Sequence, residues 1–177
     1  QVARYSHEQW HSPVVIMMLM LFMFIGASPG GTGGGIKTTT FSLLLRWAKE
    51  LMLGRYGKDI IALKKRIPLE QAYRAFLIVV LSTLTVTGAF FLILLAEHQP
   101  PLKVLFELFS AFGTVGLSLG SAINPACSLV YDFSAFGKII IVCVMIAGRV
   151  GTLTIGSALL RPHPLEYSYP EEPIVVG

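Results

Sequence analysis

The sequence predicts an all-α membrane protein of helices and short re-entrant loops, in which one helix is broken by a glycine-rich loop at membrane depth. The 177 residues are 54% hydrophobic and 14% charged, with a mean hydropathy of +0.68, whereas globular domains carry about 25% charged residues. Long apolar segments alternate with short stretches rich in glycine, proline or basic residues. We therefore expect membrane lipid around the apolar segments, and the modest net charge of +4 suggests no nucleic-acid partner.

The first helix is predicted to end in the glycine-rich loop. Its apolar residues run from Val14 to Ile25, behind Ser12 and Pro13, a pair typical of a helix N-terminus. The chain then reads GASPGGTGGGIKTTT from Gly26 to Thr40, with five glycines within six residues. Glycine loses the most conformational freedom on folding and proline removes a backbone donor, so this stretch cannot continue the helix.

The place of this loop inside a hydrophobic segment indicates its surroundings. Lipid cannot satisfy free N–H and C=O groups, so such backbone persists at membrane depth only where protein buries it or water reaches it. We therefore expect residues 26–40 to lie in a permeation path, with the helix resuming near Ile36 and leaving the membrane near Arg46–Arg55. A nucleotide-binding loop of the pattern G-x-x-x-x-G-K-[ST] is a weaker alternative, because Ile36 separates Gly35 from Lys37. A flexible surface linker would have polar flanks.

Basic residues predict the topology. They crowd the segment after the loop, and a cluster of Lys and Arg between apolar spans marks the cytoplasmic side. They are Arg46, Lys49, Arg55, Lys58, Lys64, Lys65, Arg66 and Arg74. Residues 58–69 are therefore expected to form a cytoplasmic connector, with residues 1–11 outside. From Ala75 to Ala96 the chain is apolar over about the twenty residues that cross a bilayer, so this span should run from inside to outside.

The next segment is too short to cross. Residues 101–112 are predicted to be helical, and the eleven from Leu102 to Phe112 make about 16 Å of helix. GTVGLSLG follows at residues 113–120, before a polar stretch without a basic cluster. A short helix with a glycine-containing return indicates a re-entrant hairpin, in which Glu107 is expected to be paired or to face a water-filled vestibule.

Residues 113–120 contain TVG, which is typical of potassium filters. In such filters backbone carbonyls replace the hydration shell of the ion, and glycine allows the carbonyls to turn toward the pore axis. The predicted filter residues are Thr114, Val115, Gly116, Leu117 and Ser118. Potassium is expected on the carbonyls of the first three, and an ordinary extracellular turn is the alternative.

The last helix carries a charge at membrane depth. It is predicted over residues 135–160 with Ser134 as its N-cap, followed by a cytoplasmic tail over residues 162–177. A charge at the centre of a membrane helix costs about 2.5–3.5 kcal/mol, so Arg149 is expected to face a partner or water. Lys37, at the inner end of the glycine loop, is either a second cation lining the route or a side chain that snorkels to the interface.

A depth count suggests the partner of Arg149. It lies 15 positions after Ser134, and Ser28 lies 15 positions after Pro13, so both are about 22 Å below their helix starts. If both helices begin near the outer surface, the guanidinium is level with the glycine loop and its donors can hold free loop carbonyls. Snorkelling, or an ion pair with Glu107 or another acid, is the alternative.

Three motifs together resemble a known family. GASPGGTGGGIKTTTF, LFELFSAFGTVGLSLG and AGRVGTLTI occur in this order, and the tail reads YSYPEEPIVVG. With these motifs nearly the whole chain resembles the last part of the Trk/Ktr/HKT superfamily of potassium transporters, and most of all the bacterial Ktr membrane subunit. The resemblance implies four repeats of helix, re-entrant pore loop and helix around one pore, of which this chain holds the final one and a half.

The resemblance also assigns the parts. Residues 1–57 would contain the second helix of the third repeat with its gating loop, and residues 70–161 would form the fourth repeat, with residues 114–118 as its filter strand. The gate would consist of Ser28, Gly30, Gly31, Thr32, Gly33, Gly34, Gly35, Lys37 and Arg149.

The expected function is potassium uptake across the bacterial inner membrane, with no catalytic residue and no cofactor. The resemblance implies a homodimer controlled by a cytoplasmic ring of nucleotide-binding subunits. Because the chain starts with Gln1 rather than Met, we expect a piece of a longer protein that supplies the other filter strands. One alternative is a sodium-transporting or sodium-coupled relative. Another is a membrane-embedded phosphate-handling enzyme or ATP-driven pump subunit that uses Lys37 and the threonines at 38–40 on a phosphate, although the sequence shows no acidic metal site or His pair near the loop. Cys127 and Cys143 show no metal-binding spacing either.

Overall fold

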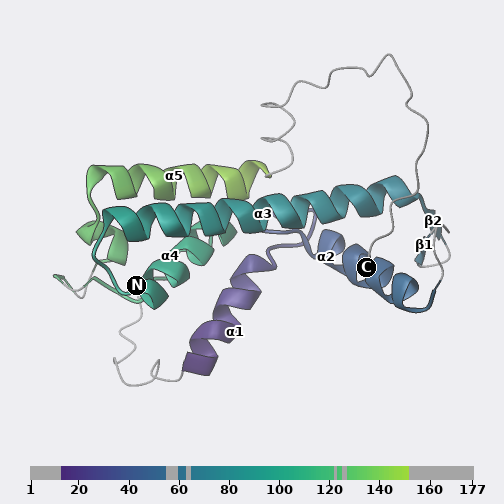
Figure 1. Ribbon diagram of the computed structural model, residues 1–177, viewed down its shortest axis with the longest axis horizontal. Coiled ribbons are helices and arrows are strands. Elements are labelled where there is room, and N and C mark those ends of the chain that lie inside the picture. Colours follow the sequence, from purple (N-terminus) through teal and green to yellow (C-terminus); the bar gives the residue numbers. More distant parts are fainter. Residues whose placement is uncertain (1–12, 55–59, 63–64, 122, 125–126, 152–177) are drawn as a thin grey trace, which may run out of the picture.

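The computed structural model describes residues 13–54, 60–62, 65–121, 123–124 and 127–151. In this part the chain is mostly helical, as the sequence predicts (Figure 1). The elements are α1 (Pro13–Phe24), α2 (Thr38–Met52), β1 (Ile60–Ala62), β2 (Lys65–Ile67), α3 (Leu69–Ala96), α4 (Pro101–Gly113), the 3-10 helix η1 (Leu129–Asp132) and α5 (Ala135–Val150). The expectations for residues 1–12, for the end of the last helix and for the tail lie outside the described residues.

α3 is the long axis of the molecule (Figure 1). Its 28 residues make a helix about 42 Å long. Among the described residues it is the one helix long and apolar enough to cross a membrane. The predicted span ends where α3 ends, at Ala96, but the helix begins earlier, at Leu69, directly after the extended backbone of Pro68.

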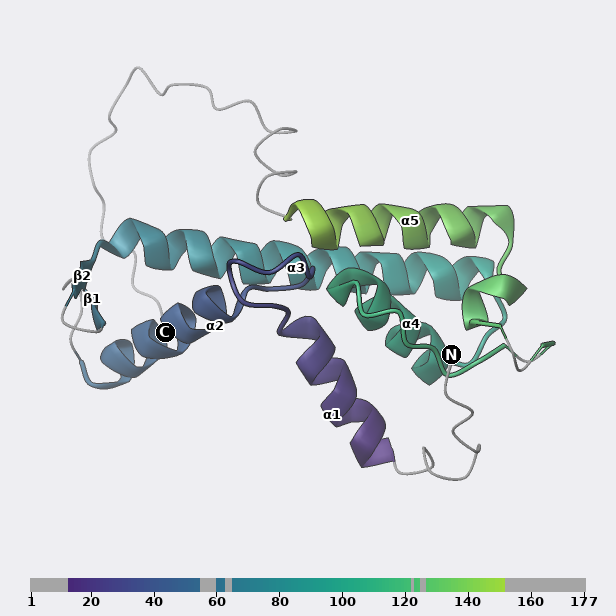
Figure 2. The ribbon, with the colours of Figure 1, turned by 180° about the vertical axis from the view of Figure 1, so that it is seen from behind.

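α4 and α5 pack together on one half of α3 (Figures 1 and 2). Their buried side chains form one apolar core, which includes Ile93 from α3, Leu108 and Phe112 from α4 and Val144 from α5. Ile36 from the glycine loop is buried in the same core and is 2% exposed. The loop is thus anchored in the interior on one side.

α1 and α2 leave the loop toward different halves of the molecule. α1 packs on α4, where Met20 and Met23 are buried against Phe106. α2 packs on the other half of α3, and Trp47 makes edge-to-face contacts with Tyr73 and Phe76 at ring-centroid distances of 5.9 and 6.1 Å. The loop between α1 and α2 therefore lies near the middle of α3 (Figure 2).

The basic connector between α2 and α3 contains a short antiparallel hairpin that was not predicted. Ile60 of β1 pairs with Ile67 of β2, and Ala62 pairs with Lys65. Each strand has three residues, which is too short for an alternating pattern to distinguish a strand in the sequence.

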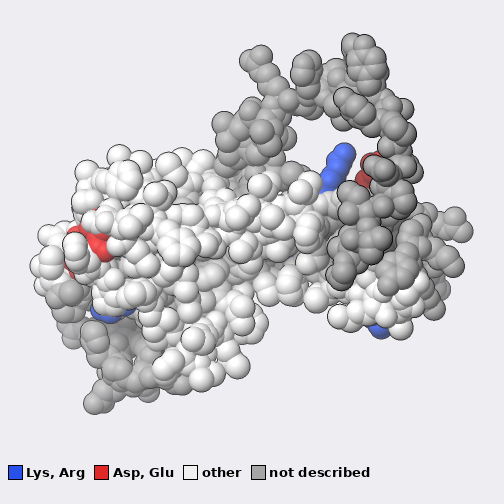
Figure 3. Space-filling view, viewed as in Figure 1, with Lys and Arg blue, Asp and Glu red and all other residues white. Residues whose placement is uncertain are grey.

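Charged side chains mark the two ends of the long axis. On the face shown in Figure 3, the blue and red side chains gather at both ends, and a wide uncharged belt separates them. Apolar side chains such as Phe91 of α3 and Ile139 of α5 remain exposed, at 59% and 61%. Such a belt is what the hydrocarbon of a bilayer requires of a protein surface.

At one end of the molecule, hydrogen bonds join the end of α3 to the start of α5. As predicted, Ser134 is the N-cap of α5, and its hydroxyl accepts a hydrogen bond from the amide of Gly137 at 3.3 Å. Glu97, which follows α3, accepts from the amide and from the hydroxyl of Ser134 at 2.8 and 2.5 Å. The carboxylate therefore fixes the start of α5 beside the end of α3.

Candidate functional site

The glycine loop is pinched at its base. α1 ends at Phe24 and α2 begins at Thr38, so the predicted break in the helix is present. The amide of Ile36 donates to the carbonyl of Phe24 at 3.0 Å, and the amide of Gly26 donates to the carbonyl of Ile36 at 2.8 Å. We call these two bonds the neck of the loop. They hold Ile36 in extended backbone, so α2 starts slightly later than expected.

Lys37 bonds two carbonyls inside the loop. Its Nζ donates to the carbonyl oxygen of Gly31 at 3.2 Å and to that of Gly33 at 2.9 Å. A tight turn precedes these glycines, because the amide of Gly31 donates to the carbonyl of Ser28 at 2.8 Å. Unpaired carbonyls are costly at membrane depth. The ammonium group of Lys37 therefore stabilises the loop and adds its positive charge to it.

Arg149 does not make the contact predicted for its side chain. The backbone of α5 does lie at the height of the loop, as the depth count predicts. The amide of Gly35 donates to the carbonyl of Gly148, the residue before Arg149, at 3.2 Å. The Arg149 side chain is exposed, and within the described part of the chain no hydrogen bond joins it to the loop. Lys37 bonds the carbonyls instead. Counting residues gives the height along a helix but not the side to which a side chain points.

Three segments meet at Gly34 with no room for a side chain. An added Cβ at Gly34 would lie 2.8 Å from the carbonyl oxygen of Phe112 and 3.1 Å from that of Gly148. At Gly148 an added Cβ would lie only 1.9 Å from the Phe112 oxygen. The amide of Gly34 donates to Oγ1 of Thr114 at 2.8 Å. The loop therefore touches both the end of α4 and the inner half of α5.

The predicted filter segment follows α4 and returns along it (Figure 2). Thr114 ends α4 in the left-handed conformation, with φ 54° and ψ 38°. Gly116 has φ 82°, which glycine adopts without the strain that a Cβ would cause. Lys103, in the first turn of α4, donates to the carbonyl of Gly120 at 3.4 Å. The segment thus runs from one end of α4 back to the other.

Ser118 fastens this returning segment. Its Oγ accepts from the amides of Gly120 at 3.2 Å and Leu129 at 3.0 Å. Glu107 is buried, and its Oε2 has no hydrogen-bond partner among the described residues. The glutamate lines a cavity of about 430 Å³ that extends to Lys138 of α5. Of the two alternatives expected for Glu107, the structure therefore shows a cavity beside its side chain.

Residues 3–166 match the TrkH family, described as cation transport protein. The chain belongs to this family. It is 36% identical over 169 residues to the Ktr system potassium uptake protein B of Vibrio alginolyticus, which is 96% of this chain and 35% of the relative.

Two further relatives of this TrkH-family chain carry related names. The Ktr system potassium uptake protein D of Bacillus subtilis is 35% identical over 167 residues, covering 94% of this chain and 35% of the relative. The potassium/sodium uptake protein NtpJ of Enterococcus hirae is 32% identical over 169 residues, covering 92% and 35%. The chain spans about a third of the length of these curated relatives. The resemblance inferred from the sequence motifs is thereby confirmed.

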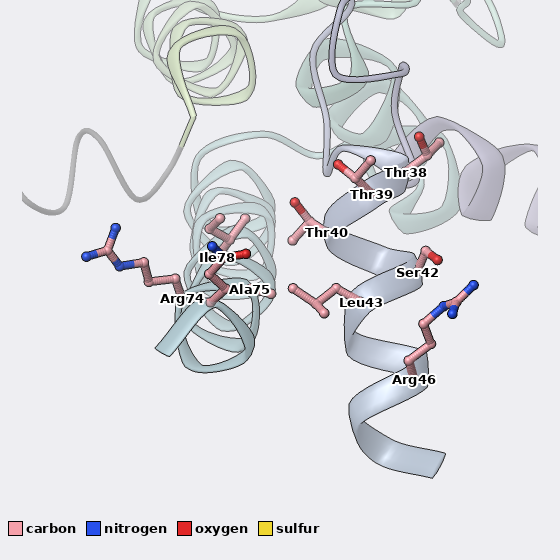
Figure 4. A pocket seen from close by; sticks show the side chains of 10 residues that line it. Thr38, Thr39, Thr40, Ser42, Leu43, Arg46, Arg74, Ala75 and Ile78 are labelled. Atoms are coloured by element: carbon pink, nitrogen blue, oxygen red, sulfur yellow. The ribbon is translucent and has the colours of Figure 1, made fainter. Parts of the chain in front are cut away.

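One face of α2 in this TrkH-family chain was missed in the sequence analysis. A cavity of about 620 Å³ lies along α2 and α3. In Figure 4, Leu43 points toward α3, whereas Thr38, Ser42 and Arg46 lie on the opposite side of α2. These three polar residues recur at a spacing of four, and this periodicity was the signal that could have revealed a solvated face.

The site offers oxygen atoms rather than a metal cluster. Within the residues that the structure describes, no group of three or more His, Cys, Asp or Glu side chains could hold a metal ion. The groups that converge at the loop are backbone carbonyls, the Thr114 hydroxyl and the ammonium group of Lys37. Carbonyl oxygens are the groups that replace water around a monovalent cation in a filter.

Proposed function

We propose that the chain is the last part of a subunit that takes up potassium across the plasma membrane, with residues 114–118 as one filter strand and residues 28–35 as the gate. The observation that carries this proposal is the hydrogen bond from Gly34 to Thr114, which puts a broken helix directly against the TVG segment. The cation-transport family and the relatives named potassium uptake proteins support it. The other filter strands would come from the rest of a longer protein.

In the proposed filter, the carbonyls of Thr114, Val115 and Gly116 replace the water around the ion. Residues 115–117 are exposed, which suits a strand that faces a pore shared with other strands. The positive φ of Gly116 turns the chain there, and the bonds of Ser118 hold the far end of the segment in place.

In the proposed gate, the glycine loop lies at the inner end of the filter and carries positive charge. An ion that leaves the filter meets the loop, inside which Lys37 is bonded. Arg149 directly follows Gly148, the residue of α5 whose carbonyl the loop contacts. In a water-poor passage, like charges repel strongly over a few ångströms. Flux then requires the loop to move aside or water to screen these charges.

We extend the proposal to the assembly by family resemblance. Two copies of the whole subunit would form a dimer in the lipid bilayer, on which a cytoplasmic ring of nucleotide-binding subunits acts. The basic connector with β1 and β2 would face that ring, because clustered lysine and arginine residues favour the cytoplasmic side.

Rubidium uptake tests the transport function. The whole subunit, produced in bacteria that lack their own potassium uptake, is expected to take up rubidium and to support growth at low potassium. Absence of uptake by a subunit shown to be in the membrane would contradict the proposal. Adding and withdrawing sodium tests the second candidate, a sodium-coupled transporter, which is suggested by the similarity to the potassium/sodium uptake protein NtpJ of Enterococcus hirae. Nucleotide binding by the subunit alone would favour the pump alternative.

A further inference from the structure

We propose that the side chain of Thr114 is a latch that fastens the glycine loop to the filter segment, so that the filter and the loop move as coupled parts. This inference rests on the proposed function, because it assigns a device to the filter and the gate described above. Thr114 would be a positioning residue: its hydroxyl holds the loop and its carbonyl belongs to the filter.

The loop is first of all tied to itself. The neck bonds join Phe24, Gly26 and Ile36, and the Lys37 ammonium group joins the carbonyls of Gly31 and Gly33. These bonds connect residues that are close in the sequence and do not depend on α4 or α5. The part of the loop beyond the neck can therefore shift while the neck, with Ile36 buried in the core, stays in place.

Hydrogen bonds attach the loop to α4 and α5 at two adjacent amides, and the buried side chain of Ile36 anchors its neck in the core. Among the hydrogen bonds of the described residues, the amide of Gly34 reaches Oγ1 of Thr114 at 2.8 Å, and the amide of Gly35 reaches the carbonyl of Gly148 at 3.2 Å. The second acceptor is a backbone carbonyl of α5. The first acceptor is a side chain of the filter segment, so it is the one that links gate and filter.

The conformation of Thr114 determines where its hydroxyl points. Its amide donates to the carbonyl of Ala111 at 3.1 Å, and the next amide, of Val115, donates to the carbonyl of Ser110 at 2.9 Å. These bonds hold Thr114 in the left-handed region, at φ 54°, which is uncommon for a β-branched residue. If the filter backbone leaves this conformation, the hydroxyl leaves Gly34.

A competing role for the hydroxyl is direct contact with the ion at the inner end of the filter. The two roles differ in what they require. If the hydroxyl of Thr114 binds the ion, its loss should impair ion binding whatever the position of the loop. If the hydroxyl is a latch, its loss should change the position or mobility of the loop. A measurement on the loop itself therefore distinguishes them.

The test compares Thr114→Val, which keeps the shape and loses the hydroxyl, with Thr114→Ser, which keeps the hydroxyl. Both are made in the whole subunit with Cys127 and Cys143 replaced by alanine, and with Gly30→Cys as the reporter. Gly30 is exposed, and an added Cβ there meets no atom within 4 Å among the residues that the structure describes. We expect Thr114→Val to raise the rate of modification by a water-soluble thiol reagent about three- to tenfold, as for loss of one hydrogen bond. Thr114→Ser should stay near the parent rate.

Val115→Ala is the matched control, because it alters the same segment at an exposed side chain that the described hydrogen bonds do not connect to the loop. It should leave the reporter rate unchanged. The latch is refuted if Thr114→Val reacts like the parent protein, or if Val115→Ala accelerates the reaction equally. A fall in rubidium uptake without any change at the reporter would assign the hydroxyl to the ion instead.

A second measurement needs no substitution at Thr114. Hydrogen exchange of the loop peptide in the unaltered subunit should be slower in potassium chloride than in choline chloride of equal ionic strength, because an occupied filter holds the latch residue in place. Equal exchange in both salts would overturn the coupling. These readouts remain measurable in a subunit that transports no rubidium, so failure of the latch and failure of the proposed transport function can be told apart.

Discussion

Thr114 and Gly116 lie two positions apart and both have positive φ, 54° and 82°. The environment of Gly116 is open, because an added Cβ would meet no atom of the described residues within 4 Å. The requirement for glycine there comes from the backbone, since a side chain in left-handed conformation costs about 1–2 kcal/mol. The carbonyl directions of the proposed filter thus depend on the backbone conformation of Gly116 and not on packing around a side chain there.

Gly116→Ser should therefore weaken ion selectivity more than it weakens folding. We expect the preference for potassium over sodium to fall by about tenfold, as for about 1.4 kcal/mol of strain placed on one binding geometry. Competition between sodium and rubidium in uptake assays measures this. Gly88→Ser, on α3 where an added Cβ also meets no atom, is the control. Unchanged ion preference would count against the filter assignment.

Arg149 tests the electrostatics of the proposed gate separately from its hydrogen bonds, because no hydrogen bond among the described residues joins its side chain to the loop. Arg149→Ala removes a charge that the loop does not bind, so we expect flux to rise roughly severalfold through reduced repulsion. Initial rubidium uptake at matched protein levels measures this. Lys138→Ala, near the other end of α5, should have a much smaller effect. Unaltered or abolished flux with normal assembly would refute a gating role for Arg149.

At this scale the sequence showed where the chemistry lies but not which atoms meet. The glycine loop, the TVG segment and the height of Arg149 followed from composition, spacing and helix rise. The loop carbonyls are nevertheless bonded by Lys37, and the hydroxyl of Thr114 received no role before the structure. Both depend on side-chain directions, which residue spacing does not determine.

At the scale of elements, the crossing of α4 and α5 determines how close the loop can come. Gly148 lies against the carbonyl oxygen of Phe112, so the absence of a side chain lets the two helices approach there. Glycine at such a contact permits a backbone separation that alanine would forbid.

Gly148→Ala should consequently destabilise the packing of α4 against α5. Its Cβ would lie 1.9 Å from the Phe112 oxygen, and overpacking of this kind costs about 1–3 kcal/mol. Thermal unfolding of the purified subunit in detergent should show a lower Tm than the parent, while Gly88→Ala should not. A Tm equal to that of the parent would mean that α4 and α5 can move apart at little cost. That result would contradict the close contact described at Gly148.

Helices were easier to predict than the connector. The start of α4 at Pro101, the end of α3 at Ala96 and the cap at Ser134 follow from proline, apolar length and a hydroxyl before a helix, which are local signals. The β1–β2 hairpin has three residues per strand and sits among basic residues that served only to assign a side of the membrane. Such short strands are stabilised by pairing with each other. A pattern search within a short stretch of sequence does not detect this pairing, so the hairpin was not predicted.

At the scale of the whole molecule, the uncharged belt and the long α3 define one direction across the bilayer (Figure 3). The end with Glu97 should face outward, and the end with the basic connector should face the cytoplasm. The exposed apolar faces of α1 and α5 are consistent with a chain that lipid and further parts of a longer subunit cover.

Thiol labelling tests this orientation. In intact cells a membrane-impermeant reagent should modify His98→Cys, just beyond α3, but not Lys49→Cys in α2; both positions are exposed. In inside-out vesicles the pattern should reverse. Cys127 and Cys143 are replaced beforehand. The same labelling pattern in both preparations, or the reverse one, would contradict the assigned topology.

The neck of the glycine loop has a consequence for how the membrane acts on the protein. The neck bonds join Phe24, Gly26 and Ile36. While these bonds remain, the ends of α1 and α2 need not separate when loop residues 27–35 shift. If the proposed gate opens by a shift of the loop beyond this neck, we expect the cross-sectional area of the protein in the plane of the bilayer to stay nearly constant. Lateral tension performs work only when that area changes, so stretching the membrane should neither open nor close this passage.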